Sequence, residues 1–136
     1  MKLESFIINT DNISIDVKGI YYDLHNNFDF RSIIYDVSKR HVQLLWIKGA
    51  GEWVPKDLPE SIMLVFDGVS AVKLKERDPQ MPYTEDDCLG SIGFSNLSDE
   101  NFCNHEPFDD AECLFMEFMS GAFIKIQSDS CLCVVK

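Results

Sequence analysis

Long apolar runs are missing from this sequence of 136 residues. A membrane-spanning helix needs about 20 consecutive apolar residues, and the uninterrupted apolar runs here extend over only a few, so we expect no membrane span. The first residues, MKLESFIINTDN, contain one lysine and no apolar stretch of the kind that a secretory signal requires. The sequence therefore predicts a soluble protein of the cytoplasm.

Familiar catalytic and cofactor motifs are also missing. The sequence contains no G-x-S-x-G nucleophile motif, no glycine-rich phosphate loop and no H-E-x-x-H metal motif. We therefore expect no cofactor and a protein that is not an enzyme. An enzyme with a less familiar site stays as an alternative, because the absence of these motifs removes only the easily recognised classes.

Basic residues are missing from about a third of the chain. Residues 78–124 contain eleven Asp and Glu and no Lys or Arg, so they account for the whole net charge of −11. A negative protein of this kind is not expected to bind nucleic acid, which attracts positive surfaces. An acidic face suits a basic protein partner, since opposite charge speeds association. The alternative interpretation is a solvated face that only keeps the protein soluble.

The five cysteines are odd in number and irregular in spacing, which favours free thiols over a disulfide framework. In a strand, Cys131 and Cys133 would share one face, with Leu132 on the other, and both would be small buried apolar residues. A zinc site made from these two cysteines with Cys103 and His105 is the alternative, although its spacing fits structural zinc poorly. Cys103 beside His105 is also the one local arrangement that suggests a thiol with a base.

The acidic pairs do not form a recognised metal loop. Asp86-Asp87 and Asp109-Asp110 supply clustered oxygen atoms, but neither pair lies in the spacing of a calcium-binding loop. We therefore predict no metal site.

Alternation of apolar and polar residues, interrupted by turn residues about every ten positions, is typical of strands. No helical stripe of ten or more residues is present. The pattern predicts one all-β or β-dominated domain over residues 1–136, an antiparallel sandwich or strongly bent sheet with at most one short helix. The expected strands are Phe6–Ile8, Ile13–Val17, Phe28–Asp36, His41–Ile47, Ile62–Phe66, Val69–Leu74, Leu89–Phe94, Cys113–Met119, Ala122–Gln127 and Cys131–Val135.

Three short turns connect expected hairpins. Val37–Arg40 and Ser120-Gly121 each separate two strand patterns. Asp67-Gly68 is a strong hairpin signal, and the competing interpretation there is one long strand with a glycine bulge. Residues 49–59 contain two prolines and two glycines and are expected to form a loop, and residues 84–87 a single helical turn.

Several aromatic and apolar residues are assigned to the core from their patterns. Trp46 lies within an apolar strand, and Phe94 is also expected to be buried. Leu114, Met116 and Phe118 share one uniformly apolar face, which should point inward. Trp53 lies in the Gly/Pro-rich loop, where we favour a plug at the end of the sandwich over an exposed ligand platform.

Part of the sequence resembles small bacterial single-domain proteins found among candidate immunity proteins of polymorphic toxin systems. The resemblance covers roughly residues 40–95 and the C-terminal hairpin. It lies in Trp53-Val54-Pro55-Lys56-Asp57-Leu58-Pro59, Ile62–Val69, Asp78–Pro82 and Asp86-Asp87-Cys88-Leu89 followed by Ile92-Gly93-Phe94. It includes no catalytic motif and implies a non-enzymatic cytoplasmic protein that acts by binding.

The leading hypothesis is an acidic protein whose region from Asp78 to Glu117 docks on a basic protein partner, such as a toxin. Exposed aromatics among the acids would serve as apolar anchors. The expected contacts are Asp86, Asp87, Asp99, Glu100, Phe102, Glu106, Phe108, Asp109 and Asp110. The alternative is a β-sandwich that binds a small ligand or a glycan through Trp53 and Tyr83. The sequence does not indicate an oligomeric state.

The cysteine assignment predicts a metal-independent fold. Protein purified under reducing conditions should contain no stoichiometric zinc, and a chelator should leave its melting temperature unchanged, because buried thiols need no ion. Elemental analysis and thermal unfolding check this. One zinc per chain, lost together with stability, would instead establish the site at Cys103, His105, Cys131 and Cys133.

Overall fold

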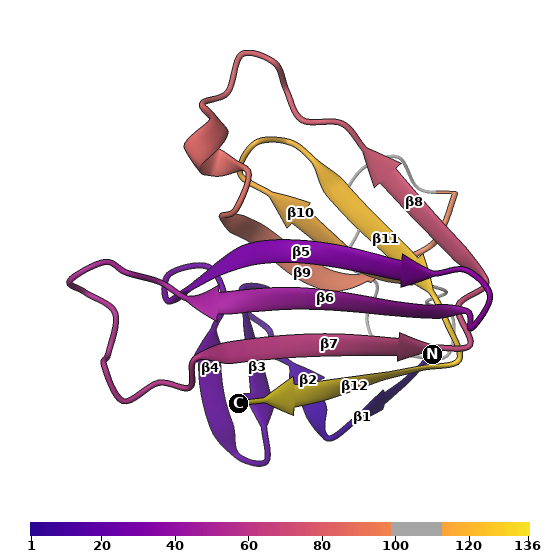
Figure 1. Cartoon of the computed structure of the whole chain (residues 1–136), viewed down its shortest axis with the longest axis horizontal. Coiled ribbons are helices and arrows are strands. Elements are labelled where there is room, and N and C mark those ends of the chain that lie inside the picture. Colours follow the sequence, from indigo (N-terminus) through magenta and orange to yellow (C-terminus); the bar gives the residue numbers. More distant parts are fainter. Residues whose placement is uncertain (99–112) are drawn as a thin grey trace.

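The computed structural model describes residues 1–98 and 113–136 of the chain. Its largest sheet has five strands in the order β1-β12-β7-β6-β5 (Figure 1). The bounds are β1 (Lys2–Glu4), β5 (Phe28–Asp36), β6 (His41–Lys48), β7 (Ser61–Asp67) and β12 (Ser130–Val135). Neighbouring strands are antiparallel except for β1 and β12, which run parallel.

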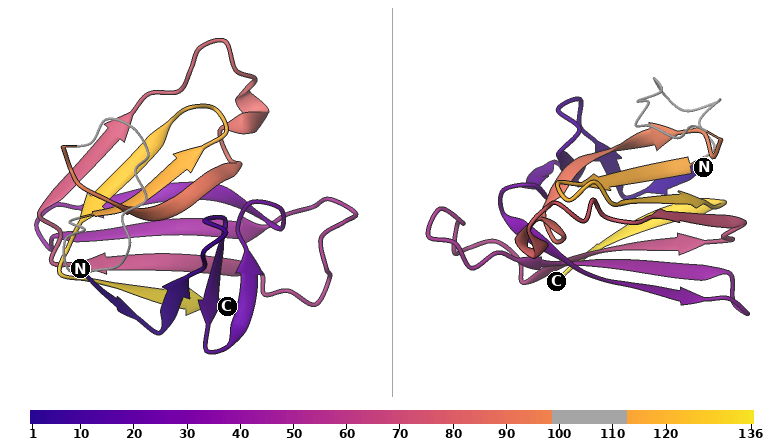
Figure 2. Two further views of the ribbon diagram at one scale, coloured as in Figure 1. Left: turned by 180° about the vertical axis from the view of Figure 1, so that it is seen from behind. Right: turned by 90° about the horizontal axis from the view of Figure 1, so that it is seen from above.

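Two smaller sheets lie on one side of this large sheet (Figure 2). The four-stranded sheet has the order β8-β11-β10-β9, and the three-stranded sheet has the order β2-β3-β4. Their bounds are β2 (Phe6–Ile8), β3 (Ser14–Val17), β4 (Ile20–Asp23), β8 (Ala71–Lys75), β9 (Leu89–Ser95), β10 (Cys113–Phe118) and β11 (Phe123–Gln127). The predicted all-β class is confirmed.

Helical structure among the described residues is limited to one 3-10 turn, η1 (Tyr83–Glu85), close to the expected helical turn. No side chain caps η1, because Pro82 stands at its N-terminal position. The described part of the chain holds no helix with the length and apolarity needed to cross a membrane.

Strict alternation builds the core between the sheets. In β6 the side chains of Val42, Leu44 and Trp46 are fully buried, whereas the residues between them are only partly buried. Successive residues of a strand point to opposite faces, so these three side chains face the smaller sheets. Leu114 and Met116 of β10 are also fully buried. The core positions predicted for Trp46 and for the apolar face of β10 are confirmed.

Two of the three expected hairpins are present. The turn at residues 37–40 joins β5 to β6, and the turn at Ser120-Gly121 joins β10 to β11. Strand β4 was not predicted, although it forms a hairpin with β3. Lys18 and Gly19 connect them with φ angles of 53° and 85°, the left-handed values of a tight hairpin turn. Lysine is unusual at such a position, so the sequence carries no typical signal for this turn.

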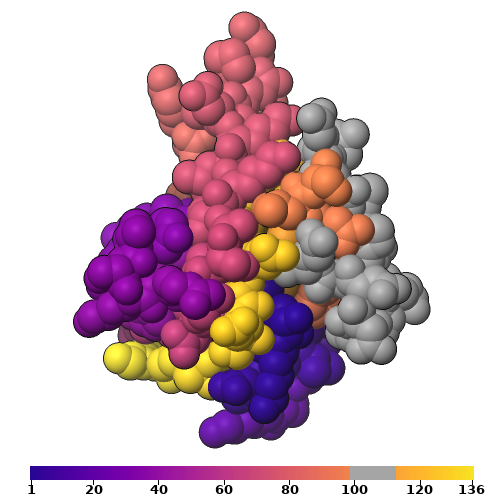
Figure 3. All heavy atoms as spheres, turned by 90° about the vertical axis from the view of Figure 1, so that its right-hand side faces the viewer, coloured from indigo at the N-terminus to yellow at the C-terminus, as the bar shows by residue number. Residues whose placement is uncertain are grey.

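The hairpin predicted at Asp67-Gly68 is wrong, and so is the alternative of one bulged strand. β7 belongs to the five-stranded sheet and β8 to the four-stranded sheet, so the chain changes sheets here. The amide of Val69 donates to the carbonyl of Arg40, and the amide of Ser70 to that of Gln127, both at 2.9 Å. Figure 3 shows this segment (rose) passing between the β5–β6 turn (purple) and the β11–β12 region (yellow). Bonds to two different sheets replace the direct pairing of a hairpin.

Gly68 is required at this crossing. Its φ angle is +67°, and a Cβ atom at this position would lie 2.1 Å from Oδ2 of Asp129. Gly68→Ala should therefore lower the free energy of unfolding by about 1–3 kcal/mol, measured by denaturant titration. Gly19→Ala is the matched control, because its φ is +85° with no atom within 4 Å of the added Cβ.

The double variant Gly68→Ala/Asp129→Ala separates the cost of the backbone conformation at Gly68 from that of the close approach to Asp129. Removing the Asp129 carboxylate should bring the loss close to that of Gly19→Ala, where only the backbone is strained. An equal loss for Gly68→Ala with and without Asp129 would contradict the close approach as a source of the effect.

Candidate functional site

Four connections gather at the end of the large sheet where β5 begins and β6 ends. They are the β4–β5 turn (residues 24–27), the β6–β7 loop (49–60), the β8–β9 segment (76–88) and the β10–β11 turn (119–122). In Figure 1 this end lies at the left, with the β8–β9 segment above it. We call these four connections the loop end.

Hydrogen bonds tie these connections to one another. The indole Nε1 of Trp53 donates to the carbonyl of Asn26 at 2.8 Å, which links the β6–β7 loop to the β4–β5 turn. The amide of Met119 donates to the carbonyl of Cys88 at 2.9 Å, which links the β10–β11 turn to the β8–β9 segment. These bonds join the four connections in two pairs, and a contact between Cys88 and His25 joins the two pairs.

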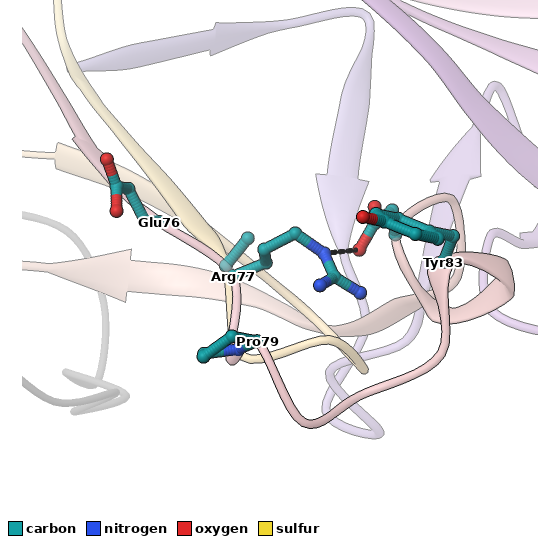
Figure 4. A pocket seen from close by; sticks show the side chains of 6 residues that line it. Glu76, Arg77, Pro79 and Tyr83 are labelled. Carbon is teal, nitrogen blue, oxygen red and sulfur yellow. Dashed lines mark hydrogen bonds and ion pairs between the residues drawn. The ribbon is translucent and has the colours of Figure 1, made fainter.

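Arg77 organises the β8–β9 segment. Its Nε donates to Oδ1 of Asp86 at 2.8 Å, and its terminal nitrogen donates to the carbonyl of Met81 at 2.6 Å. The guanidinium carbon lies 4.5 Å from the ring centroid of Tyr83, a cation–π contact. Figure 4 shows Arg77 pointing toward Tyr83, whereas Glu76 points away from it. These contacts hold an irregular segment in one conformation.

An open pocket of about 580 Å³ is lined by Glu76, Arg77, Pro79, Tyr83, Asp86 and Ala122. A second pocket of about 500 Å³ shares Asp86 and Ala122 with it, and its walls include Phe118 and Ile124. Tyr83 leaves 82% of its surface exposed beside the first pocket. An aromatic face next to paired charges can stack a flat or ring-shaped ligand.

Cys88 and His25 form a pair that the sequence did not reveal. Sγ of Cys88 lies 3.6 Å from Nδ1 of His25, and Nδ1 also contacts the carbonyl of Leu89. A carbonyl only accepts, so the contact assigns the Nδ1 proton to a bond with Leu89. The nitrogen nearest to the thiol is then a donor and cannot take its proton. This geometry does not suit a Cys–His catalytic dyad.

Four carboxylates act electrostatically on the Cys88 thiol. Burial raises the pKa of Cys88, and the negative charges of Glu85, Asp87, Asp29 and Asp23 raise it further. The pKa of Asp29 is also raised, first by burial and then by the charge of Asp87. These four acids therefore concentrate negative potential at the loop end, and two of them belong to the half of the sequence in which charges balance.

The predicted site residues that the structure describes all lie at the loop end. Asp86 forms an ion pair with Arg77. Asp87 is exposed, and its charge raises the pKa of Asp29. Tyr83 is exposed beside the first pocket. The other predicted contacts lie outside the described residues: Asp99, Glu100, Phe102, Glu106, Phe108, Asp109 and Asp110.

The predicted plug at Trp53 is wrong. Trp53 is 72% exposed, and the neighbouring Val54 is buried in its place. A Cβ atom on Gly51 would lie 2.4 Å from the Trp53 ring, so the ring lies against the backbone of its own loop. The burial predicted for Phe94 is confirmed.

The cysteine predictions are confirmed where the structure describes them. Cys131 and Cys133 are buried on one face of β12, and Leu132 is exposed on the other. Burial raises the pKa of both thiols, that of Cys133 to about 12. Cys103 and His105, the other two residues of the alternative zinc site and the expected thiol–base pair, lie outside the described residues. Among the residues that are described, no group of three or more His, Cys, Asp or Glu could hold a metal ion.

Sequence reasoning missed the Cys88–His25 pair and the contributions of Asp23 and Asp29. Residues 25 and 88 are 63 positions apart, so no spacing rule connects them. The only local signal is at Asp23, whose Oδ1 accepts the amides of His25 and Asn26 and so closes the β4–β5 turn.

Comparison of this chain with protein-family models, curated proteins and solved structures finds no significant match. The resemblance to candidate immunity proteins therefore stays a prediction.

The raised pKa of Cys88 predicts slow alkylation by iodoacetamide at pH 8, because only the thiolate reacts. Asp87→Asn removes one of the negative charges that raise this pKa, so the thiolate fraction should increase and the rate should rise roughly twofold or more. Peptide mapping by mass spectrometry reads the rate at Cys88 alone.

Glu4→Gln is the matched control, since Glu4 is not among the charges that act on Cys88. It should leave the Cys88 rate unchanged. Equal rates for Asp87→Asn and the unmodified protein would contradict the electrostatic account of this site.

Proposed function

We propose that this chain is a non-enzymatic binding protein whose loop end docks on a basic protein partner. The observation that carries the proposal is the gathering of Asp23, Asp29, Glu85 and Asp87 around Cys88, because each of these charges acts on the same thiol. The charge of Asp87 also raises the pKa of Asp29, so these two carboxylates repel one another. A partner with Lys and Arg would relieve the repulsion on binding.

Nearby cations compensate little of the negative charge of these four acids. Arg31 is the cation that lowers the pKa of Asp29, and its effect there is smaller than those of burial and of Asp87. Arg77 is already paired with Asp86. A surface of this sign attracts a basic protein over a Debye length of about 8–10 Å and so speeds its association.

Two exposed aromatic side chains at the loop end support the proposal. Trp53 and Tyr83 are 72% and 82% exposed, respectively, and both are held in place. The Trp53 indole is hydrogen-bonded to Asn26, and the Tyr83 ring is stacked on Arg77. Aromatic side chains that are fixed before binding lose little entropy in a complex, and such residues often carry much of the binding energy.

The proposal extends to an immunity-type role in the cytoplasm. A toxin that acts on nucleic acid carries a positive site, and an acidic protein that covers this site would block it. A reducing compartment is supported by the free thiols of Cys88, Cys131 and Cys133.

A second candidate function is binding of a small ligand or a glycan in the first pocket of the loop end. The exposed ring of Tyr83 beside a pocket of about 580 Å³ favours it. Trp53 does not line that pocket, so this version of the function uses Tyr83 without Trp53. Tyr83→Ala would then abolish ligand binding, whereas charge reversal at Asp29 would leave it unchanged.

The proposed function predicts an association rate that falls as salt rises. After capture of the partner from native lysate and its identification by mass spectrometry, kinetics with the purified pair should show this fall, because salt screens exposed charges. Asp87→Lys and Asp29→Lys should each lower the on-rate severalfold, up to about tenfold. Trp53→Ala should mainly raise the off-rate.

Glu4→Lys is the control, since it makes the same charge change on β1, with loss of only an exposed contact to Lys2 at 3.7 Å. Asp86 is not used, because its reversal would break the ion pair with Arg77 and disturb the segment itself. Salt-independent kinetics, or equal effects of Asp87→Lys and Glu4→Lys, would reduce the acidic group to a solvated face.

A further inference from the structure

Strand β8 has one paired edge and one open edge. It is the last strand of the four-stranded sheet, and β11 alone pairs with it among the strands that the structure describes. In Figure 1, β8 lies at the upper right of the molecule, away from the β6–β7 loop. Residues 72–75 form the open edge, which we call the free edge. An edge of this kind is where another extended chain can add as a strand.

The backbone groups of Val72 and Leu74 point out of the free edge. The carbonyl of Ala122 accepts a backbone bond of 2.9 Å from β10, so the next residue, Phe123, directs its backbone groups toward β8. Phe123 lies opposite Lys75. Because successive residues of a strand bond to alternate sides, Lys75 bonds to β11, whereas Leu74 and Val72 direct their N–H and C=O groups away from it. The free edge therefore presents two donors and two acceptors in the spacing of a strand.

The side chains of Val72 and Leu74 lie on the inner face of the four-stranded sheet. Leu74 is opposite Ile124, which belongs to the core, yet Leu74 itself is 61% exposed. It lines the second pocket, of about 500 Å³, together with Phe30 and Phe118. In a strand added beside β8, the residue opposite Leu74 would place its Cβ atom about 5 Å from that of Leu74, on the side of this pocket.

Aromatic packing fixes the floor of the second pocket. The ring centroid of Phe30 lies 4.8 Å from that of Phe118 and 5.1 Å from that of Trp46. Trp46 is fully buried, so this group is anchored in the core. A pocket that is formed before binding loses little entropy on binding, and an apolar lining selects an apolar side chain.

Two lysines determine the chemistry of the opposite face. Lys73 and Lys75 alternate with Val72 and Leu74, and Nζ of Lys75 lies 5.8 Å from the ring centroid of Phe123. Neither lysine forms an ion pair with another described residue. In an added strand, every second side chain would lie beside a lysine, where Asp or Glu is favoured. The lysines disfavour a second copy of β8, because pairing two copies would bring four lysines together.

We infer that the free edge binds an extended peptide in which apolar and acidic residues alternate. The peptide adds antiparallel to β8, which is the direction of every neighbouring pair in this sheet. Its apolar residues exchange backbone bonds with Val72 and Leu74, and its acidic residues lie beside Lys73 and Lys75. This occupant is opposite in charge to the basic partner proposed for the loop end, so the inference goes beyond that function and does not depend on it.

The test uses the full chain and a fluorescently labelled heptapeptide, Val-Glu-Leu-Glu-Val-Glu-Leu. Anisotropy at about 0.15 M salt, which screens the distant acids of the chain, should show saturable binding with a dissociation constant below about 100 µM. A peptide of the same composition with its glutamates grouped together should bind at least about tenfold more weakly, because it cannot match both faces. Absence of saturable binding up to roughly 500 µM would overturn the inference.

Methylation of the peptide backbone tests the strand geometry. In antiparallel pairing, the amides of the apolar residues face Val72 and Leu74, so methyl groups on these amides should abolish binding. Methyl groups on the glutamate amides should change the dissociation constant by less than about twofold, because those amides point away from β8. Equal effects of the two methylation patterns, or the reverse order, would contradict the proposed pairing.

Charge reversal tests the role of the lysines. Lys73→Glu and Lys75→Glu should each raise the dissociation constant at least about fivefold, because like charges opposite one another are unfavourable in a sheet. Lys56→Glu is the matched control, since it makes the same charge change at an exposed residue of the β6–β7 loop, and it should leave binding unchanged. Circular dichroism should be the same for all three variants. Equal weakening by Lys75→Glu and Lys56→Glu would show only a general charge effect and would refute the site.

Discussion

Burial of a single face of the five-stranded sheet is the interaction on which the rest of the structure depends. The side chains of Trp46, Leu64 and Phe66 are fully buried on that face, beneath the two smaller sheets. Burying a side chain of this kind contributes about 1.5–3 kcal/mol. Because a strand alternates its side chains, the residues between them point to the opposite face, which none of the other described sheets covers.

One-sided burial also determines where polar groups can gather. The two smaller sheets are connected to the large one through loops at its ends, and loops stay near water because their backbone needs hydrogen-bond partners. Acids from β4, β5 and the β8–β9 segment are thus brought around Cys88 although they are far apart in sequence. The acidic group for which we propose a basic partner therefore lies at the loop end.

Alternation predicted most of the fold, and long-range packing explains what it missed. The buried triad Val42, Leu44 and Trp46 follows from period-two spacing, since the other face of β6 begins with the polar His41 and Gln43. Asp67-Gly68 has the local chemistry of a hairpin, yet Val69 and Ser70 bond to two different sheets. Only tertiary contacts decide whether Asp67-Gly68 forms a hairpin or a connection between two sheets. The acidic excess of residues 78–124 pointed to the loop end, but nothing local indicated that Asp23 and Asp29 join it.

The parallel pairing of β1 with β12 connects the two ends of the chain. Lys2 is opposite Ser130, and Leu3 is opposite Cys131, whereas β12 itself pairs with β7 on its other side. Synthesis begins at the N-terminus, so the first strand is made long before the strand that it must pair with. Its place in the sheet exists only after β12 has been synthesised and has docked on β7. The large sheet is therefore completed only once β12 is available, and until then the edge of β7 that pairs with β12 is open.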